Sequence, residues 1–260
     1  FNFNIIMKPE ILIVNDDGIH SPGIQALADA MVKIGNVTII APDKEQSGKS
    51  HSITLNNPIR LKSVNLKNGL KGWSATGTPV DCAKVAIKTL FNRKPSLVIS
   101  GINLGANLGK NLIYSGTISA AFEGTILGIP SAAISLDSFK AKNFIGAKYV
   151  ATSIANHLLQ HKLPKGTMLN VNVPDIDQKD LKGFLVTKQG NQSFIDIFEK
   201  RIDPRGNSYF WIKGEMVNND FSIEYDGEAV SNGYVSITPI HFKLTNESYI
   251  NELKKKILYE

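Results

Sequence analysis

The sequence predicts an α/β fold: a Rossmann-like, three-layer core with a mostly parallel sheet, a C-terminal β-hairpin extension and a terminal helix. Three observations point to it. Runs of Ile, Leu and Val, typical of strands buried on both faces, alternate with helical patterns as far as about residue 180. From Gly183 the helical patterns give way to strands bounded by turn residues, and the tail returns to helical spacing. We therefore divide the chain into a core, residues 8–180, and an extension, residues 181–260.

The core repeats a strand-then-helix unit, which predicts parallel strands joined by right-handed crossovers. Two of the helices begin with a capping residue followed by proline, at Ser21-Pro22 and Thr78-Pro79. The predicted core elements, in order, are strand 11–14, helix 22–34, strand 37–41, weaker strands 53–64 and 73–75, helix 79–90, strand 95–100, helix 118–126, strand 132–136, helix 144–161 and strand 168–173.

The extension contains a clear hairpin signal. Residues 203–207 read Asp-Pro-Arg-Gly-Asn, a turn, and a strand follows at residues 208–212. A further strand is predicted at residues 234–239 and a terminal helix at residues 246–258. Because a projecting hairpin is poorly stable alone, we expect it to pair with another subunit.

Composition excludes several classes of protein. The net charge is +6, but the lysines are scattered apart from residues 254–256, so no specific nucleic-acid partner is expected. No apolar run is long enough to span a membrane, and Phe1–Met7 lacks the pattern of a signal peptide, with Met7 a candidate natural start. A lone cysteine, Cys82, excludes a disulfide framework and fits a reducing cytoplasm. Its apolar helical setting predicts a buried small hydrophobe.

The first strand ends at adjacent acids, Asp16 and Asp17, before Gly18. A glycine turn can aim both carboxylates at one point, where a divalent cation would relieve their repulsion; the alternative is a solvated acidic turn. Ser47 and Asn103 follow two other predicted strands, and ligands in open parallel sheets bind at the carboxyl ends of the strands. Together these residues offer only hard oxygen ligands, which suit magnesium, manganese or calcium.

The turn Tyr114-Ser115-Gly116-Thr117 stands at a predicted helix start and adds a further candidate site feature. Free backbone N–H groups there make an anion site, although simple capping by Ser115 or Thr117 would also explain the residues. The glycine-rich stretch at residues 101–109 matches neither the dinucleotide-binding pattern nor a P-loop.

Five motifs follow one another in order: Val-Asn-Asp-Asp-Gly (14–18), Ala-Pro-Asp-Lys-Glu-Gln-Ser-Gly (41–48), Gly-Thr-Pro-Val-Asp-Cys (77–82), Ser-Gly-Ile-Asn-Leu-Gly-Ala-Asn (100–107) and Tyr-Ser-Gly-Thr (114–117). In these motifs the chain closely resembles the SurE family of survival-protein nucleotidases. The resemblance implies a Rossmann-like core that hydrolyses nucleoside 5′-monophosphates, and in some members 3′-monophosphates, with one divalent cation per subunit.

Carried over position by position, the resemblance implies the metal ligands Asp16, Asp17, Ser47 and Asn103. Ser115, Gly116 and Thr117 match the phosphate-side motif, with Asn107 a neighbour on the substrate side. It also implies a homodimer or homotetramer formed through exchanged C-terminal elements. Mg²⁺ or Mn²⁺ is the expected cation, with Ca²⁺ as a substitute in crystals, and Asp16 or Asp17 would assist deprotonation of the attacking water.

Alternatives to nucleotide hydrolysis remain at this point. The same pocket without turnover would make a nucleotide-binding regulatory module, and a terminal phosphate of short polyphosphate would also fit the site. His20 and His51 lie close to the motif loops and receive no chemical role. His157 and His161 have a spacing that suits metal, but they lack a third ligand nearby, so an interaction with the helix C-terminus is favoured.

Overall fold

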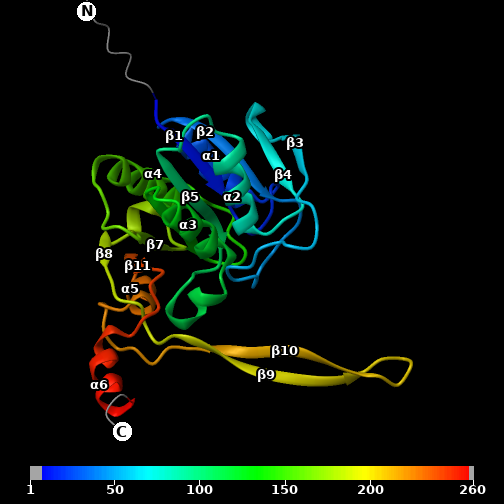
Figure 1. Ribbon diagram of the computed structural model, residues 1–260, viewed down its shortest axis with the longest axis vertical. Coiled ribbons are helices and arrows are strands. Elements are labelled where there is room, and N and C mark those ends of the chain that lie inside the picture. Colours follow the sequence, from blue (N-terminus) through cyan, green and yellow to red (C-terminus); the bar gives the residue numbers. More distant parts are fainter. Residues whose placement is uncertain (1–7, 258–260) are drawn as a thin grey trace, which may run out of the picture.

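The computed structural model describes residues 8–257, the side chain of residue 68 excepted (Figure 1). Predictions for Phe1–Met7 and for the last residue of the tail helix therefore lie outside the described residues. Among the described residues, no helix is long and apolar enough to cross a membrane.

A nine-stranded sheet forms the middle layer, in the order β3-β4-β2-β1-β5-β6-β7-β11-β8. From β4 to β7 each strand is parallel to its neighbour, whereas β3 runs antiparallel to β4 and β11 antiparallel to β7. The strands are β1 (Glu10–Val14), β2 (Asn36–Pro42), β3 (Leu61–Asn65), β4 (Lys71–Ala75), β5 (Leu97–Leu104), β6 (Ser131–Asp137), β7 (Thr167–Pro174), β8 (Phe184–Val186) and β11 (Val235–His241).

Helices cover both faces of this sheet, which confirms the predicted three-layer α/β fold. α1 (Pro22–Met31) and α4 (Ile145–Gln160) pack on one face, and α2 (Pro79–Thr89) and α3 (Gly116–Ile126) on the other. Alternate residues of β1 serve the two cores: Ile11 and Ile13 face the first pair of helices, and Leu12 and Val14 the second. This two-sided burial explains why β1 reads as a continuous apolar run.

The predicted helix starts are also present. The Ser21 hydroxyl accepts a hydrogen bond from the Ile24 N–H at 3.3 Å, and Pro22 is the first residue of α1. Thr78 and Asp81 form a capping box at the start of α2. Cys82 is fully buried in α2 and burial raises the pKa of its thiol, which confirms its prediction as a small buried hydrophobe.

One predicted strand is wrong over most of its length. Only residues 61–64 of the expected strand 53–64 pair with the sheet, as part of β3. The preceding segment instead bonds to the start of α2: the Thr54 N–H donates to the Asp81 carboxylate at 3.1 Å, and the Thr78 hydroxyl donates to the Ser52 carbonyl at 2.7 Å. Backbone groups occupied in this way are not available to a strand ladder.

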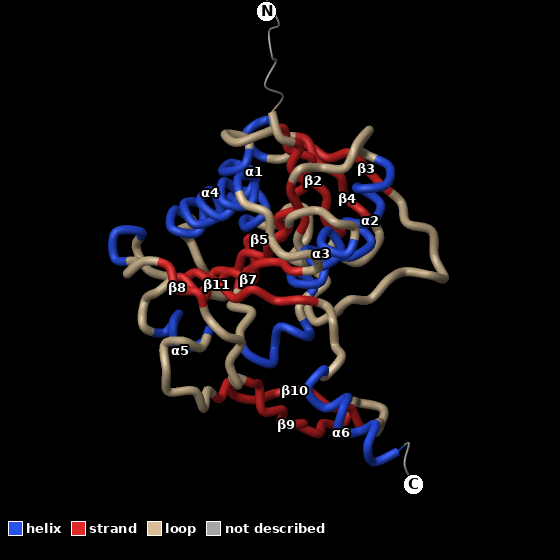
Figure 2. The backbone as a smooth tube through the Cα atoms, turned by 60° about the vertical axis from the view of Figure 1, so that its left-hand side comes forward, coloured by secondary structure: helices blue, strands red, loops and turns tan. Residues whose placement is uncertain are grey.

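The sheet draws on both predicted parts of the chain, because β8 and β11 come after residue 180, with β11 beside β7 and β8 beside β11 (Figure 2). The extension also contains the short helix α5 (Asp226–Ser231), which was not predicted, and the tail helix α6 (Glu247–Ile257). Three 3₁₀ turns complete the elements of residues 8–257, namely η1 (Lys67–Gly69), η2 (Gly109–Tyr114) and η3 (Gln178–Asp180).

The hairpin projects away from the body as a separate two-stranded sheet, β9 (Ser193–Ile202) with β10 (Ser208–Val217) (Figure 1). Its strands meet at the predicted turn, and β10 runs five residues further than expected, to Val217 rather than Ile212. Large apolar side chains on it are more than half exposed, namely Ile195, Ile197, Phe198, Ile202, Phe210, Trp211 and Ile212. Such a surface is typical of an interface with another chain.

Candidate active site at the carboxyl ends of β1 and β5

Two adjacent carboxylates mark the end of β1. Asp16 is 5% exposed, Asp17 is half-buried, and the chain turns at Gly18, whose φ of +96° is a conformation that favours glycine. The turn is held by the Asn15 side chain, whose amide donates to the Gly18 carbonyl at 3.2 Å and to the Ser21 hydroxyl at 2.7 Å. The acids are thus fixed on a rigid corner between β1 and α1.

Thr117 connects this corner to the end of β5. Its hydroxyl donates a short hydrogen bond to Asp16 Oδ1 and lies 3.2 Å from Asn103 Oδ1. The adjacent Gly116 presses against the same acid, because a methyl group added there would lie 2.9 Å from Asp16 Oδ2. Residues from β1, β5 and α3, which are distant in sequence, therefore meet at one point.

Burial and mutual repulsion destabilise the ionised forms of the two acids. Burial raises the pKa of Asp16, although the Thr117 hydroxyl and the amide groups at the start of α3 oppose the change. Burial and the neighbouring Asp16 charge raise the pKa of Asp17 to about 7, against a smaller opposing effect from the Leu104 amide. A cation between these acids would remove both the repulsion and part of the desolvation cost.

Unpartnered polar atoms gather at the same place. In the part of the chain that the structure describes, four buried side-chain atoms lack a hydrogen-bond partner, and three of them, Asp17 Oδ2, Asn15 Oδ1 and Ser100 Oγ, belong to the ends of β1 and β5; Ser100 lies opposite Val14 in the β1–β5 pairing. Buried polar groups normally find partners, so three orphans at one strand edge fit an oxygen-binding ion and its water. Among the described residues, no group of three or more His, Cys, Asp or Glu side chains is arranged to hold a metal. Any cation here would therefore take two acids and neutral oxygen donors, as Mg²⁺, Mn²⁺ and Ca²⁺ do.

Two other predicted site residues, Ser47 and Ser115, make hydrogen bonds outside this cluster. The segment carrying Ser47 is tied to it, because the Gln46 N–H donates to the Asp16 carbonyl at 2.8 Å. The Ser47 side chain itself is exposed, and its hydroxyl donates to Glu45 Oε1 at 2.6 Å. The Ser115 hydroxyl caps α3 by accepting the Ile118 N–H at 3.2 Å.

Asn107 belongs to a separate, buried set of contacts. Its side chain donates to the Ser135 hydroxyl at 2.8 Å, and its backbone N–H donates to the Asn172 side chain at 2.7 Å. Its carbonyl accepts from the Asn170 side chain at 2.9 Å. These bonds fix the loop after β5 to β6 and β7, so the geometry gives Asn107 a part in holding that loop.

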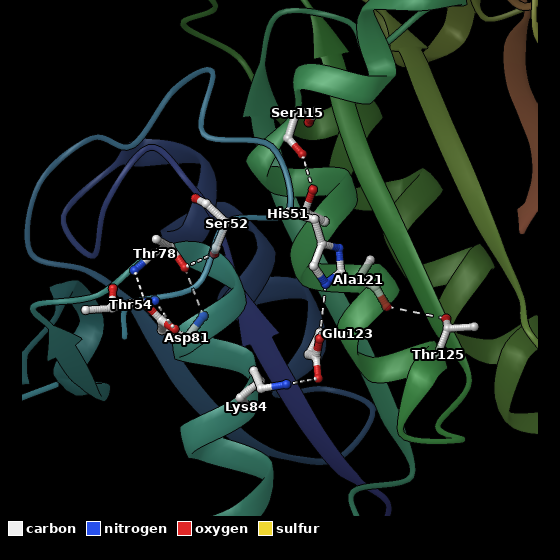
Figure 3. A network of polar contacts seen from close by, with 11 residues as sticks. His51, Ser52, Thr54, Thr78, Asp81, Lys84, Ser115, Ala121, Glu123 and Thr125 are labelled. Atoms are coloured by element: carbon white, nitrogen blue, oxygen red, sulfur yellow. Dashed lines mark hydrogen bonds and ion pairs between the residues drawn. The ribbon is translucent and has the colours of Figure 1, made fainter. Parts of the chain in front are cut away.

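Sequence reasoning missed a network that anchors the loop after β2 (Figure 3). Glu123, on α3, is 2% exposed, and its two carboxylate oxygens contact Lys84 Nζ at 2.9 Å and His51 Nε2 at 3.1 Å. Ser50, which directly precedes His51, donates its N–H to the Tyr114 carbonyl at 3.0 Å. The loop bearing Ser47 is thus fixed to α3 through His51 and to η2 through Ser50. The sequence feature that could have indicated this network is Glu123 itself, a single acid in the otherwise uncharged α3 sequence.

Comparison with known proteins finds relatives that match almost the whole chain. A family model described as Survival protein SurE matches residues 11–196. A protein named 5′-nucleotidase SurE from Carboxydothermus hydrogenoformans is 44% identical over 249 residues, which cover 94% of each chain. One of the same name from Chlorobium phaeobacteroides is 42% identical over 250 residues, 96% of this chain and 97% of the other. The crystal structure of the Sure protein from Aquifex aeolicus matches with a TM-score of 0.83 and 40% identity, covering 97% of this chain and 100% of the other.

The Glu123 network predicts a pH-dependent stability. Burial alone would raise the pKa of Glu123, but hydrogen bonds from His51 and Lys84 outweigh it and hold the pKa below its ordinary value of 4.5. Since the folded-state pKa lies below the unfolded-state pKa, the ionised carboxylate stabilises the fold above about pH 4.5. This contribution is lost as the pH falls through the lowered pKa.

We therefore expect Glu123→Gln to lower the free energy of unfolding at pH 7 by about 1.5 kcal/mol, the low end for hydrogen bonds to charged groups because Lys84 is half exposed. Urea unfolding should show a smaller difference from wild type at pH 4. Glu252→Gln, which breaks an exposed ion pair with Lys256, is the control and should cost less than about 0.5 kcal/mol. A cost for Glu123→Gln that stays the same at both pH values would contradict the ionic role.

Proposed function

This chain belongs to the survival protein SurE family, and on that premise we propose that it hydrolyses nucleoside 5′-monophosphates to nucleoside and phosphate with the help of a divalent cation. The proposal is supported by the name 5′-nucleotidase SurE carried by relatives that match almost the whole chain. It is supported independently by the chemistry of the strand ends, where acids, neutral oxygens and a helix start converge.

The observation that carries the proposal is the convergence of Asp16, Asn103 and Thr117 beside the unpartnered Oδ2 of Asp17. We assign Asp16, Asp17, Ser47 and Asn103 as the residues that would hold the cation. When bound, the cation would polarise the phosphate and provide a place for the attacking water. Two carboxylates balance a divalent charge, so a phosphate dianion can approach without strong repulsion.

The protein groups then have separable roles. Asp17 is the better proton acceptor for the attacking water, because Asp17 Oδ2 is free whereas Asp16 Oδ1 already accepts from Thr117. The first turn of α3, with Ser115, Gly116 and Thr117, lies at the positive end of an 11-residue helix. That end favours the Asp16 carboxylate and would favour negative charge on the phosphate in the transition state. Asn107 would act by holding the loop that follows Asn103 at the end of β5.

Finer features of the activity are part of the same proposal. Mg²⁺ or Mn²⁺ suits the oxygen donors. A nucleoside 3′-monophosphate or the end of a short polyphosphate presents the same terminal phosphate group to the site, so we include both as secondary substrates. The base would not take part in the chemistry at phosphorus, and its binding must come from residues at the rim of the site.

We also propose that the enzyme is a homodimer or homotetramer in which the β9–β10 hairpin packs on a second copy. A two-stranded hairpin is marginal in water on its own. Phe198 and Ile212 are paired across its strands and are 61% and 63% exposed, so a partner surface would bury both. This assigns residues 8–180 to the chemistry and the hairpin and tail helix of residues 181–260 to assembly, while β8 and β11 complete the core sheet.

Replacement of either acid tests the activity. Asp16→Asn and Asp17→Asn should each lower phosphate release from adenosine monophosphate by about 100-fold or more, because a cation ligand and the proton acceptor are affected. The wild type should lose activity in a chelator and regain it with Mg²⁺ or Mn²⁺. Asp175→Asn, which alters an exposed acid after β7, is the matched control and should leave turnover unchanged. Near-wild-type turnover in both site variants would sink the mechanism, and tight nucleotide binding with no phosphate release by the wild type would favour the regulatory module.

The hairpin assignment predicts a change in assembly. Phe198→Lys places a charge in the centre of the exposed apolar surface, so the variant should sediment as a monomer in analytical ultracentrifugation, whereas wild type sediments as a dimer or larger. Phe198→Leu keeps the surface apolar and should remain assembled. A monomeric wild type, or an assembled Phe198→Lys variant, would contradict the role of the hairpin.

A further inference from the structure

An exposed aromatic ring stands at the rim of the candidate site. Phe139 follows the end of β6 and is 84% exposed. A phenylalanine so exposed contributes little to the core, and the hydrophobic effect disfavours leaving its ring in water. Its position is therefore better explained by a ligand that covers the ring than by folding.

The ring lies against the loop that directly follows Asn103 and the end of β5. A methyl group added at Gly105 would be 2.5 Å from Phe139 Cε1, so only glycine leaves room for the ring there. The carbonyl of the same glycine accepts a hydrogen bond from the Asn103 side chain at 2.6 Å, and its N–H donates to the Leu136 carbonyl at 2.9 Å. One residue thus contacts both the aromatic ring and the side chain that reaches Thr117.

Other exposed aromatic rings fit the role less well. Among the described residues, the rings more than 60% exposed are Tyr114, Phe139, Phe198 and Phe221. Phe198 belongs to the hairpin, and Phe221 lies in the segment after it. Tyr114 directly precedes Ser115, but its known contact is a backbone bond that holds the loop at Ser50. Phe139 alone among them is packed against the residue bonded to Asn103.

We propose that Phe139 stacks on the nucleobase of the substrate and so gives the site its preference for nucleotides over phosphate esters without a base. This rests on the proposed function, since the phosphate would be held between the acids and α3 while the ribose carries the base outward to the rim. Stacking on an aromatic face is available to every base, so the contact would favour nucleotides as a class without choosing among bases.

The test compares a nucleotide with its sugar phosphate. Phe139→Ala should raise KM for adenosine monophosphate by about tenfold, a loss within the range for removal of one base-stacking side chain, with little change in kcat. The KM for ribose 5-phosphate should stay within about twofold, because this substrate has no base to stack. Phe139→Trp retains a flat ring and should restore the KM for the nucleotide.

Two matched variants separate the ring from general effects. Phe221→Ala removes an equally exposed ring elsewhere and should leave both KM values unchanged. Tyr114→Ala removes the other ring near the site. An unchanged nucleotide KM in Phe139→Ala, an equal rise for both substrates, or a rise confined to Tyr114→Ala would each overturn the proposal.

Failure of the proposed function has a different signature. If wild type releases phosphate from neither substrate, the hydrolytic activity is wrong, and calorimetric titration of adenosine monophosphate into wild type and Phe139→Ala then tests the stacking by itself. Weaker binding to Phe139→Ala, with equal binding of ribose 5-phosphate, would support the contact. Equal nucleotide affinity of the two proteins would overturn it.

Discussion

Two carboxylates placed side by side at the end of a buried strand are the constraint on which the site depends. Asp16 is almost inaccessible, Asp17 is half-buried, and burial together with repulsion from Asp16 raises the pKa of Asp17 to about 7. The fold accepts this arrangement because β1 is buried on both faces and paired with β2 and β5, and because Gly18 turns the chain sharply toward α1. Such a pair is unfavourable without a counter-charge, and the energetic cost is typical of sites built to bind a cation.

The parallel sheet supplies the remaining groups through its geometry. The carboxyl ends of β1, β2 and β5 lie along one edge, so Asp16, the segment before Ser47 and Asn103 come together although they are far apart in sequence. Helix α3 closes the site from one face with Thr117 and its positive end. Glu123, seven residues into the same helix, holds the loop after β2 through His51, so one helix contributes both a contact to the acids and an anchor for the neighbouring loop.

Much of this arrangement was predictable from local patterns. Two-sided apolar runs predicted the strands of the core, capping residues predicted the starts of α1 and α2, and the position of the acids after a strand predicted where they lie. What escaped prediction depends on long-range contacts. Residues 53–55 have strand-like composition, yet the Thr54 N–H donates to Asp81 and the neighbouring Ser52 carbonyl accepts from Thr78. Periodicity assigns Glu123 to a helix but cannot reveal its partner His51, which is 72 residues away in the sequence. Likewise, the contact between Phe139 and Gly105 becomes visible only in the folded chain.

The most direct test of the central claim is the thermal stability of wild type and Asp17→Asn with and without Mg²⁺ or Mn²⁺. If the acids form a repulsive pair that awaits a cation, removing one charge should raise the unfolding temperature of the metal-free protein, while the cation should stabilise wild type and have little effect on the variant. A purely structural role for Asp17 predicts the reverse. A metal-free Asp17→Asn protein that unfolds below wild type, together with a wild type that divalent cations do not stabilise, would contradict the account.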